Sequence, residues 1–223
     1  MEQLPFYIAL VMGLSTFLSA YFLAKASPKH KTRILTIAIG WLILQSLISI
    51  SGFYTHTKAM PPRFLLAIGP PFLLIIGLFA TKSGRYFIDS LEIKTLTMLH
   101  VVRIPVELVL FWLFLHKTVP EIMTFEGQNF DIISGITAPV VYYLFKKEYI
   151  GMGILLMWNF ACLMLLINIV STAILSAPFP FQQLAFDQPN IAVLYFPFNW
   201  LPCCIVPIVL FSHLVAIRKL MRE

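Results

Sequence analysis

Apolar residues dominate seven stretches of the chain, and short polar segments separate them. Most of these stretches are close to the ~20 residues that an α-helix needs to cross a hydrocarbon layer of about 30 Å. The pattern predicts membrane-spanning helices over Pro5–Ala24, Ile34–Tyr54, Phe64–Ala80, Leu96–His116, Ile132–Phe145, Ile150–Leu175 and Tyr195–Ile217. The fifth stretch is short, so it is either a re-entrant segment or a span that begins a turn earlier, near Asn129. We therefore expect an all-α polytopic membrane bundle of seven transmembrane helices, in one domain over residues 1–223.

Composition supports a membrane protein. Hydrophobic residues make up 59% of the chain and charged residues only 12%, with a mean hydropathy of +0.87. A soluble chain of this length cannot bury so much apolar surface. The first stretch has no positive residue before it, whereas Lys25 and Lys29 follow it. That order is typical of a retained helix whose N-terminus is outside, and it is the reverse of a cleaved signal peptide.

The basic residues predict how the bundle is oriented. If all seven stretches cross, one face receives Lys25, Lys29, Lys31, Arg33, Lys82, Arg85, Lys94, Lys146, Lys147, Arg218, Lys219 and Arg222. The opposite face receives Lys58, Arg63 and Lys117. Because basic residues in short loops stay in the cytoplasm, we expect the N-terminus outside and the C-terminus cytoplasmic, in a cell membrane of the bacterial inner-membrane type. No soluble domain carries a basic patch with stacking aromatics, which argues against nucleic acid as a partner.

The fourth stretch carries the strongest candidate site. His100, Arg103 and Glu107 are spaced so that they share one face of a helix. Charges at this depth cost about 2.5–3.5 kcal/mol each, so they normally face the bundle interior and form pairs. Arg103 and Glu107 are i,i+4 neighbours, and we expect them to pair with each other. Pro105 lies between them and predicts a kink with a free carbonyl at Val101.

Two interpretations of this charged face remain open. It is either a structural ion pair that locks helices together, in a structural or assembly subunit, or a site that binds and transports a small or lipid-like molecule, with a proton-linked step at Glu107. Transport or binding is the function we expect first. Polar residues of other spans that can join the site are Gln45, Tyr142 and Asn159.

A redox function is a further alternative. His100 and His213 lie at similar depths near the cytoplasmic ends of their spans. Two histidines at one level can supply both axial ligands of a haem if their helices are neighbours. Packing near the membrane surface is the favoured explanation of the same residues. The sequence indicates no other cofactor, and it carries no signal for an oligomeric state.

The outer face carries its own candidates. Arg63, Glu126, Asp131 and Asp187 all fall in outer loops of the predicted topology. Gathered in space, such residues bind a divalent cation or supply acid–base groups, which would make the protein a membrane enzyme. No HExxH spacing is present, and separate solvated charges are the ordinary alternative.

Proline and phenylalanine mark two more features. The last outer connection, around Phe179 and Phe181, is rich in both residues, and it is either an aromatic belt at the membrane surface or a lid over an outward-facing cavity. Gln182, Gln183, Asp187 and Asn190 would be the polar contacts of such a lid. Paired prolines at 70–71, and single ones at 202 and 207, predict broken helices in the third and seventh spans, as in transporters.

Overall fold

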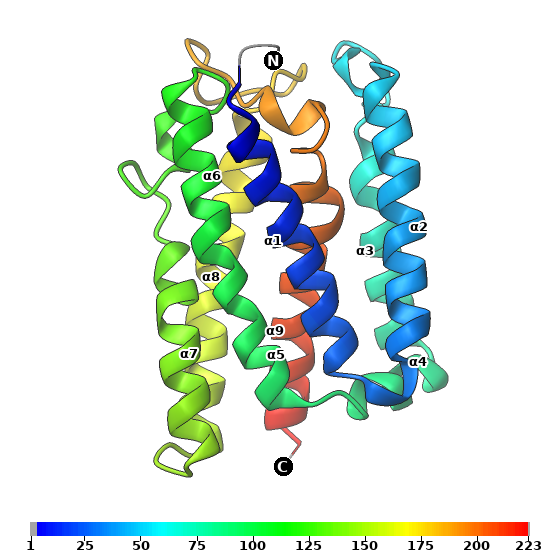
Figure 1. Ribbon diagram of the computed structural model, residues 1–223, viewed down its shortest axis with the longest axis vertical. Helices are drawn as coiled ribbons and strands as arrows, with labels where there is room; N and C mark the ends of the chain where they lie inside the picture. The colour runs from blue at the N-terminus through cyan, green and yellow to red at the C-terminus, as the bar shows by residue number, and fades with distance from the viewer. Residues whose placement is uncertain (1–3, 223) are drawn as a thin grey trace.

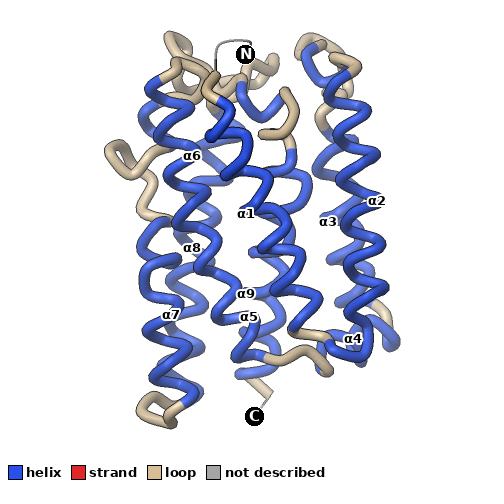
Figure 2. Tube along the Cα trace, in the orientation of Figure 1, coloured by secondary structure: helices blue, strands red, loops and turns tan. Residues whose placement is uncertain are grey.

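The computed structural model describes residues 4–222, and every regular element within them is helical (Figure 1, Figure 2). The α-helices are α1 (Phe6–Lys25), α2 (Lys31–Ile50), α3 (Leu65–Ala80), α4 (Lys82–Asp89), α5 (Ile93–Leu99), α6 (Arg103–Leu115), α7 (Ile132–Lys146), α8 (Met152–Leu175) and α9 (Val206–Leu220). A π-helical segment, Leu201–Ile205, leads directly into α9. The predicted all-helical fold is confirmed.

Several of these helices have the length and composition of membrane spans. Five stretches qualify, namely Phe6–Lys25, Pro28–Ile50, Ile93–Leu115, Met152–Leu175 and Leu201–Leu220. A sixth is added if α3 and α4, which meet at 92°, are counted as one bent span. α7 is apolar but shorter, with 15 residues. Figure 1 shows that α1 begins and α9 ends at opposite ends of the bundle.

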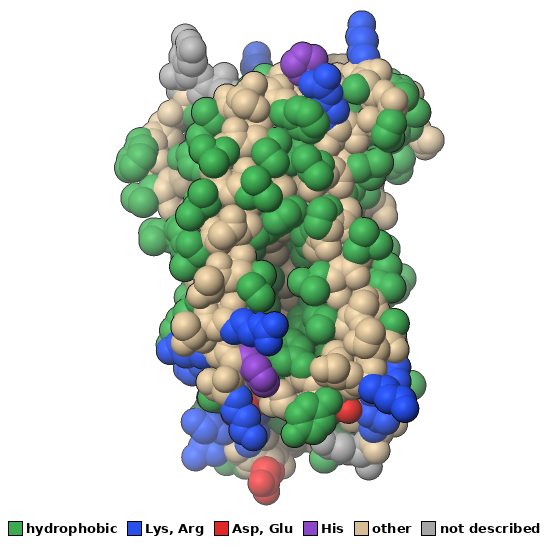
Figure 3. Space-filling model, turned by 90° about the vertical axis from the view of Figure 1, so that its right-hand side faces the viewer, with side chains coloured by type: hydrophobic (Ala, Val, Ile, Leu, Met, Phe, Trp, Pro, Cys, Tyr) green, Lys and Arg blue, Asp and Glu red, His purple; other side chains and the backbone are tan. Residues whose placement is uncertain are grey.

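The outer surface of the bundle is apolar. Leu73 on α3 is 68% exposed and Met157 on α8 is 72% exposed. Figure 3 shows hydrophobic side chains over the middle of one face, with lysine and arginine side chains toward its two ends. By contrast, the charged residues Arg103 and Glu107 are buried. An apolar outer belt, with the few intramembrane charges buried inside the bundle, suits a protein that spans a membrane.

The helix around the predicted charged site changes type in its middle. α5 and α6 form one continuous stretch through a 3-10 turn at His100–Val102. Pro105 has no N–H to give to the carbonyl of Val101, so α-helical pairing fails there and the backbone tightens. The expected irregularity is therefore present, and it lies just before Pro105 as a change of helix type.

The short fifth apolar stretch is a helix that begins deep in the protein. α7 starts at Ile132, the residue that the apolar pattern indicates. Figure 1 shows this start near the middle of the bundle's height, reached by an irregular segment along the side. Gly135 lets α7 approach α6 closely, because a Cβ at this position would lie 2.8 Å from Cγ1 of Ile104. Asp131, which directly precedes α7, is thereby held at the level of Arg103.

Only one of the two predicted helix breaks is present. α3 runs through Pro70 and Pro71 without interruption, so the predicted break there is wrong. Pro70 frees the carbonyl of Leu66, and Gln45 on α2 donates to it at a long 3.5 Å. The final span does change type, in the π-helical segment. Pro207 frees the carbonyl of Cys203, to which Trp41 Nε1 donates at 2.9 Å.

Candidate functional site: a buried charged cluster beside an apolar cavity

The buried cation at the centre of the bundle pairs with a carboxylate from another element. Arg103 Nη1 lies 2.9 Å from Asp131 Oδ1, and the two side chains are only 3% and 7% exposed. The expected ion pair within the helix, Arg103 with Glu107, is therefore wrong. Asp131, which the sequence places on the outer face, reaches the interior because α7 begins at this depth.

Arg103 also binds the two helices that face it. Its Nη1 donates to the carbonyl of Cys162 on α8 at 3.3 Å, and its Nη2 lies 3.1 Å from Nε2 of His213 on α9. Asn159 Nδ2 donates to the carbonyl of Leu155, so its Oδ1 is an acceptor and takes the Nδ1–H of His213 at 2.9 Å. His213 Nε2 then accepts from Arg103, which makes His213 neutral in this arrangement.

Glu107 is held by an amide. Asn129 Nδ2 donates to both carboxylate oxygens of Glu107, at 2.7 and 2.6 Å. The same nitrogen donates to the carbonyl of Met123, and Asn129 Oδ1 accepts from the backbone N–H of Asp131 at 3.0 Å. Asn129 is 1% exposed. The sequence pattern marks Asn129 only as a possible start of the short fifth span and not as a site residue.

The two histidines do meet, but as stacked rings. The ring centroids of His100 and His213 are 3.9 Å apart, with 15° between the ring planes. Bis-histidine haem ligation needs the macrocycle and its iron between the two imidazoles. Rings in van der Waals contact leave no space for that, so these residues do not fit a haem. His100 also packs against Trp158, at a centroid distance of 5.6 Å.

The remaining candidates from other spans separate into two groups. Asn159 joins the cluster through His213. Gln45 accepts from the hydroxyl of Tyr54 at 2.6 Å and connects α2 to α3, away from these contacts. Tyr142 lies near the end of α7, where Lys146 Nζ sits 5.7 Å from the centroid of its ring. In the structure, Gln45 therefore connects neighbouring helices and is not part of the charged cluster.

The four outer-face candidates do not form one site. Asp131 belongs to the buried cluster, and Glu126 is exposed. Arg63 lies over the ring of Phe53, at 4.8 Å from its centroid. Asp187 lines a separate open depression together with Glu121. Among residues 4–222, no group of three or more His, Cys, Asp or Glu side chains is placed to hold a metal ion.

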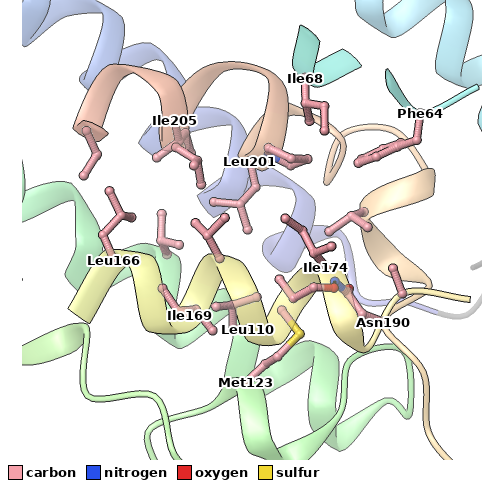
Figure 4. A pocket seen from close by; sticks show the side chains of 18 of the residues that line it. Phe64, Ile68, Leu110, Met123, Leu166, Ile169, Ile174, Asn190, Leu201 and Ile205 are labelled. Atoms are coloured by element: carbon pink, nitrogen blue, oxygen red, sulfur yellow. The ribbon is translucent and has the colours of Figure 1, made fainter. Parts of the chain in front are cut away.

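An apolar cavity of about 270 Å³ extends from the charged cluster toward the end of the bundle where α8 ends. Figure 4 shows α8 on one side, with Leu166, Ile169 and Ile174, and the π-helical segment and α3 on the other. Arg103, Glu107 and Asp131 line its deep end. Leu65 on α3 and Ile174 on α8 are about half exposed at its rim. The cavity therefore opens toward the apolar surface between these two helices.

Part of the last loop covers this cavity. Phe179 and Phe181 line it, with ring centroids 5.4 Å apart, and Phe179 also packs against Phe64 at 5.8 Å. The lid interpretation is thus the one that the geometry favours. Of the four polar contacts expected for the lid, Asn190 alone is among the lining residues of this cavity; Asp187 lines the outer depression instead.

A family model described as "Domain of unknown function (DUF8737)" matches residues 61–221. All residues that line the cavity, from Pro62 to Val209, fall inside this range. No curated protein matches the chain, and no solved structure matches it. What the site does therefore follows from its own geometry.

Proposed function

The chain belongs to the DUF8737 family, whose range includes the whole cavity, and we propose that it is a seven-span membrane protein that binds and transports a small apolar molecule. One observation carries the proposal: a cavity with apolar walls opens between α3 and α8, and a buried charged cluster lies at its deep end. Pockets that are mostly apolar with a few placed polar groups are the usual form of small-molecule sites.

The proposed topology has the N-terminus outside and the C-terminus in the cytoplasm of a bacterial inner-membrane type of bilayer. The charge bias of the loops supports it, because basic residues gather at the ends that would be cytoplasmic. In this topology α3 is the third span, and α4 lies across the cytoplasmic end of the bundle. α7 and the irregular segment before it together make the fifth crossing, which is tolerated because that segment packs on protein.

In this proposal the ligand enters the cavity laterally, from the bilayer. The rim residues Leu65 and Ile174 belong to the apolar surface of the bundle, so the opening faces lipid. An apolar molecule partitions into the bilayer first, and it then enters the cavity without crossing water. Phe179 and Phe181 cover the outer end and separate the bound molecule from the aqueous side.

A cavity-filling variant tests binding. Ala173 lines the cavity, so the phenyl ring introduced by Ala173→Phe would occupy much of it, since a cavity of ~150 Å³ holds a benzene ring. We therefore expect this variant to be labelled at least tenfold less by a photoactivatable alkane of about ten carbons. Mass spectrometry of cross-linked peptides measures the labelling. Ala161→Phe, on the exposed side of α8, is the control and should label like the unaltered protein. Equal labelling of both variants, spread over all lipid-facing helices, would refute a ligand cavity.

We assign the proton-linked step to Glu107. Arg103 makes its ion pair with Asp131, so Glu107 borders the apolar cavity with an amide as its hydrogen-bond partner. An apolar ligand beside a carboxyl group favours its neutral form, so proton uptake and ligand binding support each other. Labelling by the alkane probe is thus expected to increase as the pH falls.

The Glu107→Gln variant tests this assignment. The introduced amide carries no charge at any pH, so we expect labelling of this variant to stay the same from neutral to acidic pH, near the acidic value of the unaltered protein. Asp187→Asn, at an exposed carboxylate outside the cavity, should keep the pH response. A pH response that persists in Glu107→Gln would assign the proton to another group.

A structural or assembly role is the second candidate. Arg103 contacts three other elements at once, through Asp131, the carbonyl of Cys162 and His213. Such a set of contacts holds the helices in position without any ligand. If Ala173→Phe keeps full stability but loses the cavity-specific labelling, the result supports binding. If the unaltered protein shows no specific labelling, the result supports the structural role.

A further inference from the structure

One polar side chain at the outer end of the cavity has an unused hydrogen-bond acceptor. Asn190 lies in the loop after α8 and is 1% exposed, and it lines the cavity. Its backbone N–H donates to the carbonyl of Ser176 at 2.8 Å, which fixes its position. Its Oδ1 has no hydrogen-bond partner among the described residues. A buried acceptor without a partner costs about 1–3 kcal/mol, so it needs a reason.

The orientation of this amide is set by its neighbours. Asn190 Nδ2 donates to the carbonyl of Ala173 at 3.3 Å, so the other amide atom must be the oxygen. Figure 4 shows the Asn190 side chain reaching in among the apolar side chains around the cavity. One hydrogen of Nδ2 is used by Ala173, and the second is available beside Oδ1. The amide thus offers a ligand one acceptor and one donor side by side.

The rest of the cavity defines the body of that ligand. Aromatic rings of Phe64 and Phe179 lie near the outer end, and aliphatic side chains such as Ile169 and Ile205 form the inner walls. The volume, about 270 Å³, is nearly twice that of the ~150 Å³ cavity that holds benzene. At the deep end, Arg103 and Glu107 are engaged with Asp131 and Asn129. Among the described residues, Arg103 Nε also has no hydrogen-bond partner, but it belongs to the charged cluster at the deep end. Asn190 is therefore the neutral polar group that is open to a ligand at the outer end of the cavity.

We propose that the cavity takes a neutral alcohol with an apolar body of about ten carbons, whose hydroxyl binds Asn190. The hydroxyl donates to Oδ1 and accepts from the second hydrogen of Nδ2. An ionised carboxylate has no hydrogen to donate to Oδ1, and an alkane leaves Oδ1 unpaired. This inference rests on the proposed function, because it names the ligand class of the same cavity.

The test compares two isomers as competitors of the photoactivatable alkane. The isomers 1-decanol and methyl nonyl ether have the same atoms, but the ether has no hydroxyl hydrogen. At equal concentrations in the micelle, we expect the alcohol to compete about tenfold better with the unaltered protein, which is the effect of one hydrogen bond of about 1.4 kcal/mol. In Asn190→Leu the two should compete equally. Asn168→Leu, on the exposed side of α8, is the control and should keep the preference.

Each outcome has a distinct meaning. Equal competition by alcohol and ether in the unaltered protein overturns the role of Asn190 and leaves an apolar ligand site intact. If the preference for the alcohol persists in Asn190→Leu, the hydroxyl binds another residue, and the inference is also overturned. If the unaltered protein shows no cavity-specific labelling at all, the proposed function itself fails. Equal competition in the unaltered protein is enough to overturn the inference, even if Asn190→Leu does not fold.

Discussion

Replacing Asp131 with leucine is expected to destabilise the protein by about 3–5 kcal/mol, because it leaves the Arg103 guanidinium buried without a counter-charge. Arg103 lies 2.9 Å from Asp131, and both side chains are almost fully buried. Arg103→Met should cost a similar amount, since the carboxylate of Asp131 is then left alone. The free energy of unfolding, measured by denaturation in mixed micelles, checks both values.

The double variant identifies the cause. When both charges are removed together, no buried charge lacks a partner, so Arg103→Met with Asp131→Leu should lose clearly less than the sum of the two single variants. Asp187→Leu, at an exposed carboxylate, is the control and should change stability by less than about 0.5 kcal/mol. If the single costs simply add, the two side chains do not stabilise each other.

The helices follow from the sequence because their cause is local. Most apolar stretches are close to the length of a membrane span. α7 begins at the predicted Ile132, and α8 ends at the predicted Leu175. Pro105 also indicated an irregular helix at the right place. Pro70 and Pro71 lie inside α3 without breaking it. Gln45 of α2 donates to the freed carbonyl of Leu66, which is a tertiary contact that the local sequence pattern does not predict.

The buried cluster was predictable in part. Polar residues inside apolar stretches have to face the protein interior, which is why His100, Arg103, Glu107 and Asn159 were found. The pairing was not predictable from i,i+4 spacing. Asp131 lies in a polar connection that by composition belongs at the surface, and only the depth at which α7 begins brings it to Arg103.

The cavity could not be read from the sequence. Its walls are ordinary leucine, isoleucine and valine residues of α6, α8 and α9, and the same residues fill a packed core in other bundles. Their arrangement around an open space depends on how α3 and the last loop sit against α8. The phenylalanines of that loop suggested a lid, but they did not show what it covers.

Asn129→Leu is expected to cost about 3 kcal/mol of stability, because the buried carboxylate of Glu107 then loses the amide that donates to both of its oxygens. Asn129 has other contacts too, with the carbonyl of Met123 and the backbone N–H of Asp131. The single variant therefore does not reveal which lost contact matters. The free energy of unfolding, measured in mixed micelles, gives the summed cost of all the lost contacts.

The same substitution in a Glu107→Gln background separates these contacts. Without a charge at position 107, losing Asn129 leaves a neutral group unpaired, so the added cost should fall to about 1 kcal/mol. The contacts to Met123 and Asp131 are lost equally in both backgrounds, so they cancel in the comparison. An unchanged cost of about 3 kcal/mol in both backgrounds would mean that Asn129 acts by shaping the segment before α7. A reduced cost would mean that Asn129 stabilises a charged Glu107 beside the cavity, which is the deprotonated state that a proton-linked cycle needs before it takes up a proton.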